Sequence, residues 1–392
     1  MAYARLPGSF SRIHEMAQET CQTITLGQLM RRTGSDPKSL KWSARWLHRQ
    51  LPVRFARRIQ DVLQLPHIVV SDPSINSILT AQVDTFEKVI SFPEIRTPED
   101  EEKFFQLMKE EGTKHDSGTR LVAQGYRDAR RYYPQIDLTQ FLDDFFTTRI
   151  ATRILMDNYV EMRTPRKGFH GVVCQGMRPL EMIQELVQEV DELCRSLYGC
   201  APNIEYQGNL DCVLDYIPRH VKYMVRELLK NAFRATVERH QGKGEVDLAT
   251  VIIELQQGDI HVLVKISDQG GGMNKRLQRN AWKYGWSTAA LVGDEAWQYA
   301  EESCNWDRGK IVENTAARRP VALAGYGFGL PLTRLHAQYF GGDLFMQSIP
   351  GHGTAMYLML THLKEGTPST EIDDLSTVLY NKENLTHSAN AP

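Results

Sequence analysis

The chain has 392 residues, with 46 Lys and Arg against 48 Asp and Glu, which gives a formal net charge of -2 at pH 7. This length allows two or three domains with substantial cores, and the near-neutral charge excludes the basic bias of a nucleic-acid-binding protein. No apolar run approaches membrane-spanning length, and the six cysteines lack a paired metal-ligand spacing. We therefore expect reduced thiols, no structural zinc, no membrane span and no nucleic-acid partner.

Helical periodicity dominates the first 160 residues. The helix-like segments are residues 40–65, 75–92, 101–133 and 138–162, each separated from the next by proline. Four helices of that length predict an antiparallel bundle. Trp42 and Trp46, four residues apart in the first segment, fit core packing better than a pocket wall. Residues 1–24 form an N-terminal extension and a possible transit segment, although Glu15 and Glu19 are atypical of one.

Helices alternate with hairpins from residue 171 onward, which predicts a mixed sheet with helices on one face. We expect a helical bundle over residues 25–163, a linker, an α/β sandwich over residues 168–363, and a polar, disordered tail over residues 364–392. Residues 290–319 have no firm period, and we expect them to form a mobile lid.

Residues 221–237 carry the most informative pattern. Apolar residues recur at three- and four-residue intervals on one face of a predicted helix, and Glu227, Lys230, Asn231 and Arg234 recur on the other. Such a polar face can serve a magnesium-bound polyphosphate: the amide oxygen meets the metal, the cations meet phosphate, and the carboxylate polarises a hydroxyl. Taken alone, the pattern also fits a solvated helix face.

Two glycine-rich segments follow this helix. A strand at residues 260–266 runs into Asp268 and the glycines at 270–272, which predicts a fixed acceptor beside bare backbone where a flat base can lie. Alternate glycines in residues 324–332 precede a helix-like segment at 333–340, and such a loop offers backbone N–H groups to an anion. The loop lacks the lysine-serine ending of a P-loop, so the common nucleotide folds fit badly.

The order of these elements resembles the N, G1 and G2 boxes of the GHKL ATPase/kinase superfamily. The sequences of the motifs resemble even more closely those of the mitochondrial protein kinases, which are the pyruvate dehydrogenase kinases and the branched-chain 2-oxoacid dehydrogenase kinase. The matching motifs are Glu-Leu-Leu-Lys-Asn-Ala-Phe-Arg-Ala-Thr at 227–236, Ser-Asp-Gln-Gly-Gly-Gly at 267–272, Ser-Thr-Ala at 287–289 and Gly-Tyr-Gly-Phe-Gly-Leu-Pro at 325–331. With similar wording at 51–56 and 141–150, the resemblance covers residues 25–362.

The resemblance implies a role for each matching residue. Glu227 would be the general base toward a protein hydroxyl, and Asn231 would hold magnesium. Lys230 and Arg234 would lie near the phosphates or order the helix, and Asp268 would accept from the adenine amino group. The remaining ATP-binding residues would be Gly270 and Gly272 near the base and ribose, Ser287 and Thr288 closing on the nucleotide, Gly325, Tyr326, Gly327, Phe328, Gly329 and Leu330 around the phosphates, and Thr354 beside the adenine.

The resemblance also implies a fold and an activity. The fold would be a four-helix bundle followed by a GHKL-type (Bergerat) α/β sandwich. The activity would be that of an ATP- and Mg²⁺-dependent protein serine kinase of the mitochondrial matrix, a homodimer that inactivates the E1α subunit of a 2-oxoacid dehydrogenase complex and docks on its lipoyl domain. The wording slightly favours the pyruvate over the branched-chain complex. The alternative is a nucleotide-gated regulator that binds the lipoyl domain and hardly transfers phosphate.

Three departures from the family pattern matter. Tyr223 stands where pyruvate dehydrogenase kinases usually carry a His, four residues before the base, and Tyr cannot serve as a proton partner at neutral pH in the same way. His115 and Asp116 resemble a regulatory His-Asn-Asp motif without its Asn, and a capping pair at an exposed helix kink is the alternative. The Asp-Trp pair of tail-exchanged dimers is absent from residues 364–392.

Overall fold

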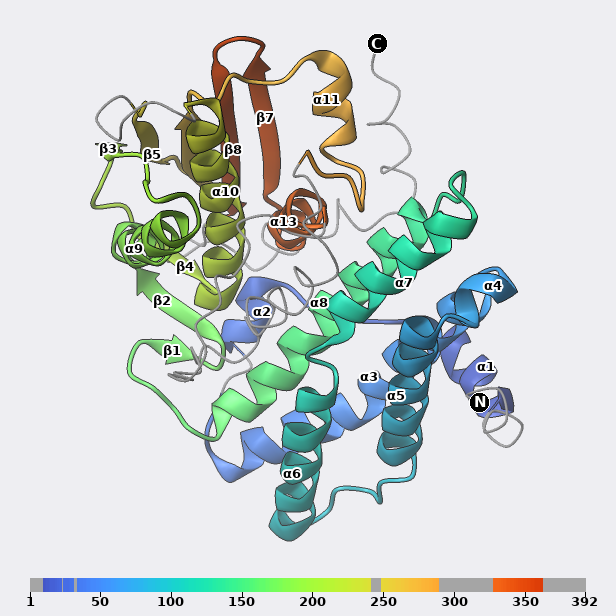
Figure 1. The fold of residues 1–392 in the computed structure, drawn as a ribbon. Coiled ribbons are helices and arrows are strands. Elements are labelled where there is room, and N and C mark those ends of the chain that lie inside the picture. Colours follow the sequence, from blue (N-terminus) through green and yellow to red (C-terminus); the bar gives the residue numbers. More distant parts are fainter. Residues whose placement is uncertain (1–9, 23, 32–33, 241–247, 289–326, 362–392) are drawn as a thin grey trace. The chain divides into compact units, whose positions relative to one another are not determined.

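A computed structural model describes the chain except for residues 1–9, 23, 32–33, 241–247, 289–326 and 362–392 (Figure 1). The chain divides into two compact units, one of residues 1–24 and 28–173 and one of residues 25–27 and 174–392. Their content, helices first and a mixed sheet with helices second, confirms the predicted fold class. Within the described ranges, none of the helices combines the length and apolarity needed to cross a membrane.

The first unit is built from helices. They are α1 (Phe10–Gln18), α3 (Pro37–Leu63), α4 (His67–Val70), α5 (Pro73–Ile90), α6 (Pro98–Lys114), α7 (Gly118–Tyr132) and α8 (Thr139–Met162), followed by the short strand β1 (Phe169–His170); α2 (Leu26–Arg31) contains the boundary between the units. Aspartates 36 and 72 cap α3 and α5 by accepting first-turn N–H groups, each with a proline just inside the helix. Helix α3 packs against α1, α5, α6 and α8 and is the centre of this unit.

The expectation of one helix over residues 101–133 is wrong, because the helix is interrupted at residues 115–117, between α6 and α7. Arginines of α8 bind the backbone and side chains exposed at the break. Arg153 Nη1 donates to the Gly112 carbonyl at 2.8 Å and to Asp116 Oδ1 at 2.6 Å, and Arg149 Nη2 donates to the Asp116 carbonyl at 3.3 Å. These tertiary hydrogen bonds replace the helical ones that the break removes.

The second unit is an α/β sandwich. Its elements are β2 (Val173–Met177), α9 (Pro179–Tyr198), β3 (Ile204–Gly208), β4 (Leu214–Tyr216), α10 (Pro218–Arg239), β5 (Val251–Gln257), β6 (His261–Asp268), α11 (Lys275–Asn280), α13 (Gly329–Gln338), β7 (Asp343–Ile349) and β8 (Gly353–Thr361). The main sheet has the order β3-β5-β6-β8-β7; β3 and β5 are parallel, and the other pairs are antiparallel.

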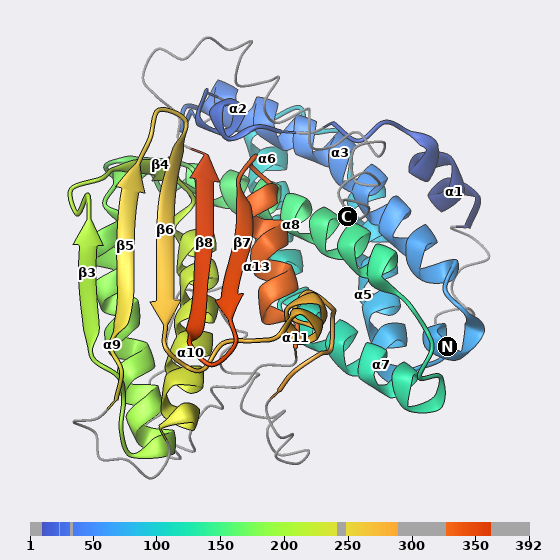
Figure 2. The same cartoon turned by 90° about the horizontal axis from the view of Figure 1, so that it is seen from above.

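One face of this sheet is covered by helices. Figure 2 shows α9, α10 and α13 on that face, with α10 packed on β5 and β6 and α13 on β7 and β8. The strands alternate accordingly, and the buried side chains of β6 are Val262, Val264 and Ile266. Helix α13 begins at Gly329, earlier than the predicted start at Thr333, so the last residues of the glycine-rich loop form its first turn.

Candidate active site

Helix α10 supplies the polar face that the sequence predicts. Its apolar residues, among them Leu228 and Leu229, are buried, while Glu227, Asn231 and Arg234 are half-buried. Lys230 turns back to the carboxylate, and its Nζ lies 3.0 Å from Glu227 Oε1. With side chains only 7% and 17% exposed, the two form a shielded ion pair.

The glycine-rich loop reaches this carboxylate. A methyl group added to Gly329 would lie 2.5 Å from Glu227 Oε2, so only a glycine allows the first turn of α13 to come this close. Gly327 is tied to the chain that follows α11, because its carbonyl accepts from the Gly285 N–H at 3.1 Å. The base candidate therefore lies beside an N-terminal helix turn, which favours an anion. Residues 325 and 326 of the predicted site lie outside the described ranges.

Two aromatic rings hold the loop in place. Tyr284 and Phe328 are both buried, with ring centroids 5.1 Å apart. Trp286 follows two residues later, and its backbone lies against Gly327. The sequence analysis missed Tyr284 and Trp286, because nothing in their spacing marks them as neighbours of a loop some 40 residues away.

Asp268 ends β6 and pairs with Thr354 of β8. Its Oδ1 accepts the Gly270 N–H at 2.8 Å. Burial raises the pKa of Asp268 to about 6, and hydrogen bonds from the backbone of Gly270 and Thr354 oppose part of that rise. The carboxylate is thus half-buried and fixed at a strand end, where the sequence predicts an acceptor for a flat base; that role stays a prediction.

The glycines after Asp268 press the loop onto its neighbours. A methyl group on Gly270 would lie 2.5 Å from the backbone of Ala235 in α10, and one on Gly272 would overlap the Ile349 carbonyl. Ser348, which the sequence analysis did not single out, accepts the Met273 N–H at 2.8 Å and lies 2.9 Å from Thr354 Oγ1. The predicted adenine-side residues thus lie in one hydrogen-bonded corner against α10.

Arg234 connects α10 to the Ser-Thr segment. Its Nη2 donates to Thr288 Oγ1 at 2.9 Å, while its Nε lies 3.5 Å from Glu238. Ser287 is half-buried and Thr288 exposed. One helix therefore touches the glycine loop, the adenine-side corner and the Ser-Thr segment.

Among the described residues, there is no group of three or more His, Cys, Asp or Glu side chains that could hold a metal ion. A magnesium ion here would take few protein ligands and share the phosphate oxygens of a nucleotide, as is usual for this cation. The amide oxygen of Asn231, one turn beyond Glu227 on α10, fits that need.

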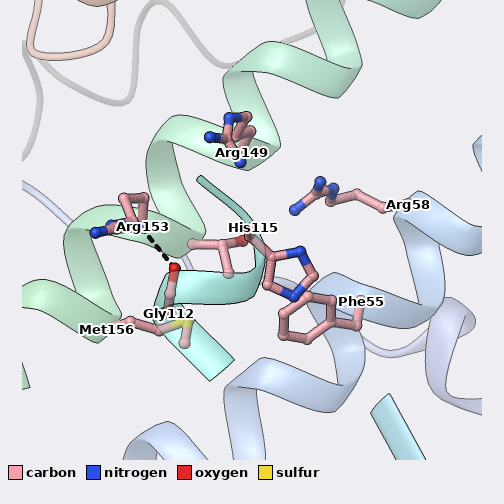
Figure 3. A pocket seen from close by; sticks show the side chains of 8 residues that line it. Phe55, Arg58, Gly112, His115, Arg149, Arg153 and Met156 are labelled. Atoms are coloured by element: carbon pink, nitrogen blue, oxygen red, sulfur yellow. Dashed lines mark hydrogen bonds between the residues drawn. The ribbon is translucent and has the colours of Figure 1, made fainter. Parts of the chain in front are cut away.

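The helical unit contains a separate small cavity (Figure 3). It lies at the break between α6 and α7, facing α3 and α8. Its lining residues are Phe55, Arg58, Gly112, His115, Arg149, Thr152, Arg153 and Met156. His115 is the C-cap residue of α6, as the alternative interpretation expects, but it is half-buried and not exposed: its ring lies 5.3 Å from that of Phe55, and its Nε2 lies 2.9 Å from Thr85 Oγ1.

Positive charge dominates this cavity. Burial and the neighbouring arginines lower the pKa of His115 to about 3, so the ring is neutral. Burial and Arg149 lower the pKa of Arg58 to about 9, which leaves the guanidinium charged at neutral pH. Arg153 is paired with Asp116 and Asp157. This electrostatic environment favours a small anion.

Comparison with known proteins places both units. Residues 216–364 match the family described as histidine kinase-, DNA gyrase B-, and HSP90-like ATPase. With the α10 face and its two glycine loops, this match defines the class: an ATP-binding protein of the GHKL type. Residues 23–174 match the family described as mitochondrial branched-chain alpha-ketoacid dehydrogenase kinase.

Relatives match over most of the chain. A mitochondrial [pyruvate dehydrogenase (acetyl-transferring)] kinase of Arabidopsis thaliana is 33% identical over 349 residues, covering 87% of this chain and 91% of the relative. The Schizosaccharomyces pombe kinase of that name is 27% identical, covering 84% and 90%, and human isozyme 4 is 28% identical, covering 90% and 83%. The chain belongs to the mitochondrial protein kinase family, which comprises the pyruvate dehydrogenase kinases and the branched-chain 2-oxoacid dehydrogenase kinase.

Proposed function

We propose that this protein is a protein serine kinase of the mitochondrial matrix that uses Mg-ATP to phosphorylate and inactivate the E1α subunit of the pyruvate dehydrogenase complex. The observation that carries the proposal is the Glu227 carboxylate held against Gly329, where the glycine-rich loop becomes helix α13. A base beside a phosphate-binding turn suits transfer of phosphate to a hydroxyl. The named relatives, which match over most of the chain, support pyruvate dehydrogenase as the target.

The four residues of the polar face of α10, Glu227, Lys230, Asn231 and Arg234, each have a part in this reaction. Glu227 accepts the proton of the attacking serine hydroxyl, and Lys230 holds the carboxylate in place. Asn231 would hold magnesium, which when bound would supply positive charge against the phosphates. Arg234 positions the Ser287–Thr288 segment beside the nucleotide.

The adenine-side corner selects the nucleotide. The carboxylate of Asp268 accepts from the amino group of adenine, while the Gly270 and Gly272 backbone lies along the base and ribose and Thr354 adds a hydroxyl. Leu330, in the first turn of α13, and the glycines at 325, 327 and 329 surround the phosphates. Because Gly270 and Gly329 both lie against α10, the nucleotide and the catalytic carboxylate of Glu227 share one rigid support.

The helical unit supplies the partner contacts in this proposal. It docks on the lipoyl domain of the complex, and two copies of the chain form a homodimer. The match of residues 23–174 to a dehydrogenase kinase family supports a docking role for this unit. The cationic cavity, which contains His115 of the predicted regulatory motif, would couple docking to activity.

Two other functions remain possible results of the experiment below. The branched-chain complex is the alternative target, because the family matched by residues 23–174 carries that description. A nucleotide-gated regulator without transfer is the alternative class, but the presence of both the carboxylate and the amide on α10 disfavours it.

Glu227→Gln is the variant that tests the proposal. Incubation of the pyruvate dehydrogenase complex with this protein and Mg-ATP should progressively abolish the activity of the complex. Glu227→Gln should slow that inactivation by about 10²–10⁴-fold, as expected for loss of a general base. ATP affinity, measured by calorimetry, should stay within a few-fold of the parent value, because adenine and phosphate contacts remain.

The matched control is Glu192→Gln, which makes the same chemical change at an exposed position of α9. It should leave the inactivation rate unchanged. If the parent protein binds ATP but inactivates neither complex, the regulator becomes the correct function. If it inactivates the branched-chain complex alone, the target assignment fails and the kinase assignment stands.

A further inference from the structure

A buried cluster of aromatic and imidazole rings lies between α10 and α13, one helical turn before the base. Tyr223, four residues before Glu227, contacts His336 of α13 with ring centroids 4.8 Å apart, and His220 contacts the same histidine at 4.9 Å. His336 is only 2% exposed, and both partners are more than 90% buried. Tyr223, which replaces the usual family His four residues before the base, is thus packed against a histidine from another helix.

The orientation of His336 is fixed by its own helix. Its Nδ1 lies 2.9 Å from the Leu332 carbonyl, and a carbonyl oxygen can only accept, so Nδ1 carries the proton. The Nδ1–H donates to this carbonyl, so the orientation of the ring is defined. A buried imidazole with a defined orientation is a specific packing partner rather than a flexible filler.

The two helices meet at two points, one at the carboxylate of Glu227 and one at Tyr223, a helical turn before it. Gly329 and His336 are seven residues apart on α13, which is two helical turns, and they contact Glu227 and Tyr223 of α10, which are one turn apart. The order of the contacts is reversed along the two helices, so α10 and α13 run antiparallel. Long helical side chains lean toward the N-terminus, which brings the Glu227 carboxylate back over the turn that contains Tyr223.

We propose that His336 is a positioning residue for phosphate transfer: its contact with Tyr223 fixes where the first turn of α13 meets the carboxylate of Glu227. The proposal rests on the kinase function and adds the residue that stabilises the geometry of its base. A shift at the His336 end moves Gly329, and with it the phosphate-binding turn, relative to the carboxylate. Misplacing reacting groups by about 1 Å can cost about 10²-fold in rate.

Ordinary core packing makes a different forecast. If the ring pair only contributed stability, variants would unfold at lower temperature but each folded molecule would transfer phosphate at the parent rate. If the pair instead fixes the position of α13 against Glu227, the single variants lose turnover although they are folded. Exchange of both residues, which restores a His–Tyr contact, then restores the turnover. Exchange of the two residues keeps the total ring volume, so it separates these possibilities.

The experiment compares Tyr223→His, His336→Tyr and the double exchange. Each single change should lower kcat at least about tenfold while KM for ATP changes less, because the adenine-side corner is untouched. The double exchange should recover most of the loss. Tyr357→His, on the opposite face of the sheet, is the matched control and should keep parent kcat.

Amide hydrogen exchange gives a readout that does not depend on catalysis. Faster exchange at residues 329–335 is expected in each single variant, with parent rates in the double exchange and unchanged rates in β6 and β8. Parent kcat in folded single variants, or no recovery in the double exchange, would overturn the inference. If the parent protein transfers no phosphate to either complex, the proposed function fails, and exchange at residues 329–335 still decides whether this contact positions α13.

Discussion

Asp268 keeps a carboxylate half-buried at the end of a central strand, at a cost to stability. Its pKa rises from 3.8 to about 6, mainly through burial, so the contribution to stability is full below pH 3.8 and is lost as pH rises through 6. At neutral pH the folded protein therefore carries an ionised group that would be better solvated in the unfolded chain. Such a cost suits a residue retained for a ligand.

Asp268→Asn should stabilise the protein and weaken ATP binding. The amide oxygen can still accept the Gly270 N–H, while the cost of burying charge disappears, so unfolding at pH 8 should become harder by on the order of 2 kcal/mol. This gain should shrink as pH falls from 6 to 4. The amide NH₂ would face the amino group of adenine, so ATP affinity should fall at least about tenfold.

Thermal unfolding at pH 8 and pH 4, with calorimetric titration of ATP, checks both effects. Asp211→Asn is a useful control, because the Asp211 side chain is 89% exposed in the loop between β3 and β4. An unchanged ATP affinity in Asp268→Asn would show that this carboxylate does not contact the nucleotide.

At the scale of residues, sequence predicts groups whose type and helical spacing carry chemistry, such as Glu227, Asn231 and Asp268. It does not predict Tyr284 or Ser348, because their importance comes from tertiary contacts with Phe328 and Thr354. It also misplaces Trp42: core packing is the favoured expectation, but the residue is 48% exposed. A four-residue spacing of tryptophans indicates a helix face without telling which neighbour covers it.

Helix α10 is the element on which the site depends. It packs on β5, β6, α9 and α13, and it also contacts the glycine-rich loop, the corner after β6 and the Ser-Thr segment. Each of these segments contacts a different residue of α10, so this one helix sets the distances between them. Glycine at the contact points allows backbone, rather than side chains, to define those distances.

Gly329→Ala tests the contact between α13 and this helix. The added methyl group would lie 2.5 Å from Glu227 Oε2, so the carboxylate or the helix turn must move. We expect kcat to fall by about tenfold to 10²-fold with little loss of stability, because alanine favours helix formation.

Gly258→Ala is the control for that change. A methyl group at Gly258, in the β5–β6 turn, would come no closer than 3.5 Å to its nearest neighbour. Steady-state phosphate transfer, measured for both variants, should separate them. Equal activity of Gly329→Ala and the parent protein would mean that the close approach to Glu227 is not required for transfer.

At the scale of elements, the pattern predicts the long helices and the β5–β6 hairpin, since periodicity and turn residues are local signals. It does not predict the break at residues 115–117. The segment 101–133 is helical in periodicity, and only the arginines of α8, which bind Gly112 and Asp116, show why the helix stops there. The early start of α13 also depends on a tertiary contact. Glycine in sequence predicts a loop, whereas Gly329 is in the first helical turn, where it lies against Glu227.

At the scale of the whole molecule, each unit has a distinct chemical character. The second unit has the α10 face with its glycine loops, and the first has a cationic cavity with a neutral histidine. Neither an ATP-binding sandwich nor a helical bundle alone defines a target. Their presence in one chain, which relatives named as pyruvate dehydrogenase kinases match over most of its length, supports the proposed action on a dehydrogenase complex.

The most direct test is transfer of labelled γ-phosphate from Mg-ATP to the purified E1α subunits of the pyruvate and branched-chain complexes, each supplied with its lipoyl-bearing core. We predict an acid-stable label on serine of pyruvate dehydrogenase E1α, and none when Glu227→Gln replaces the parent protein. A serine ester survives acid, whereas a phosphohistidine does not, so the label also reports the acceptor. Parent protein that binds ATP yet labels neither subunit would contradict the central claim.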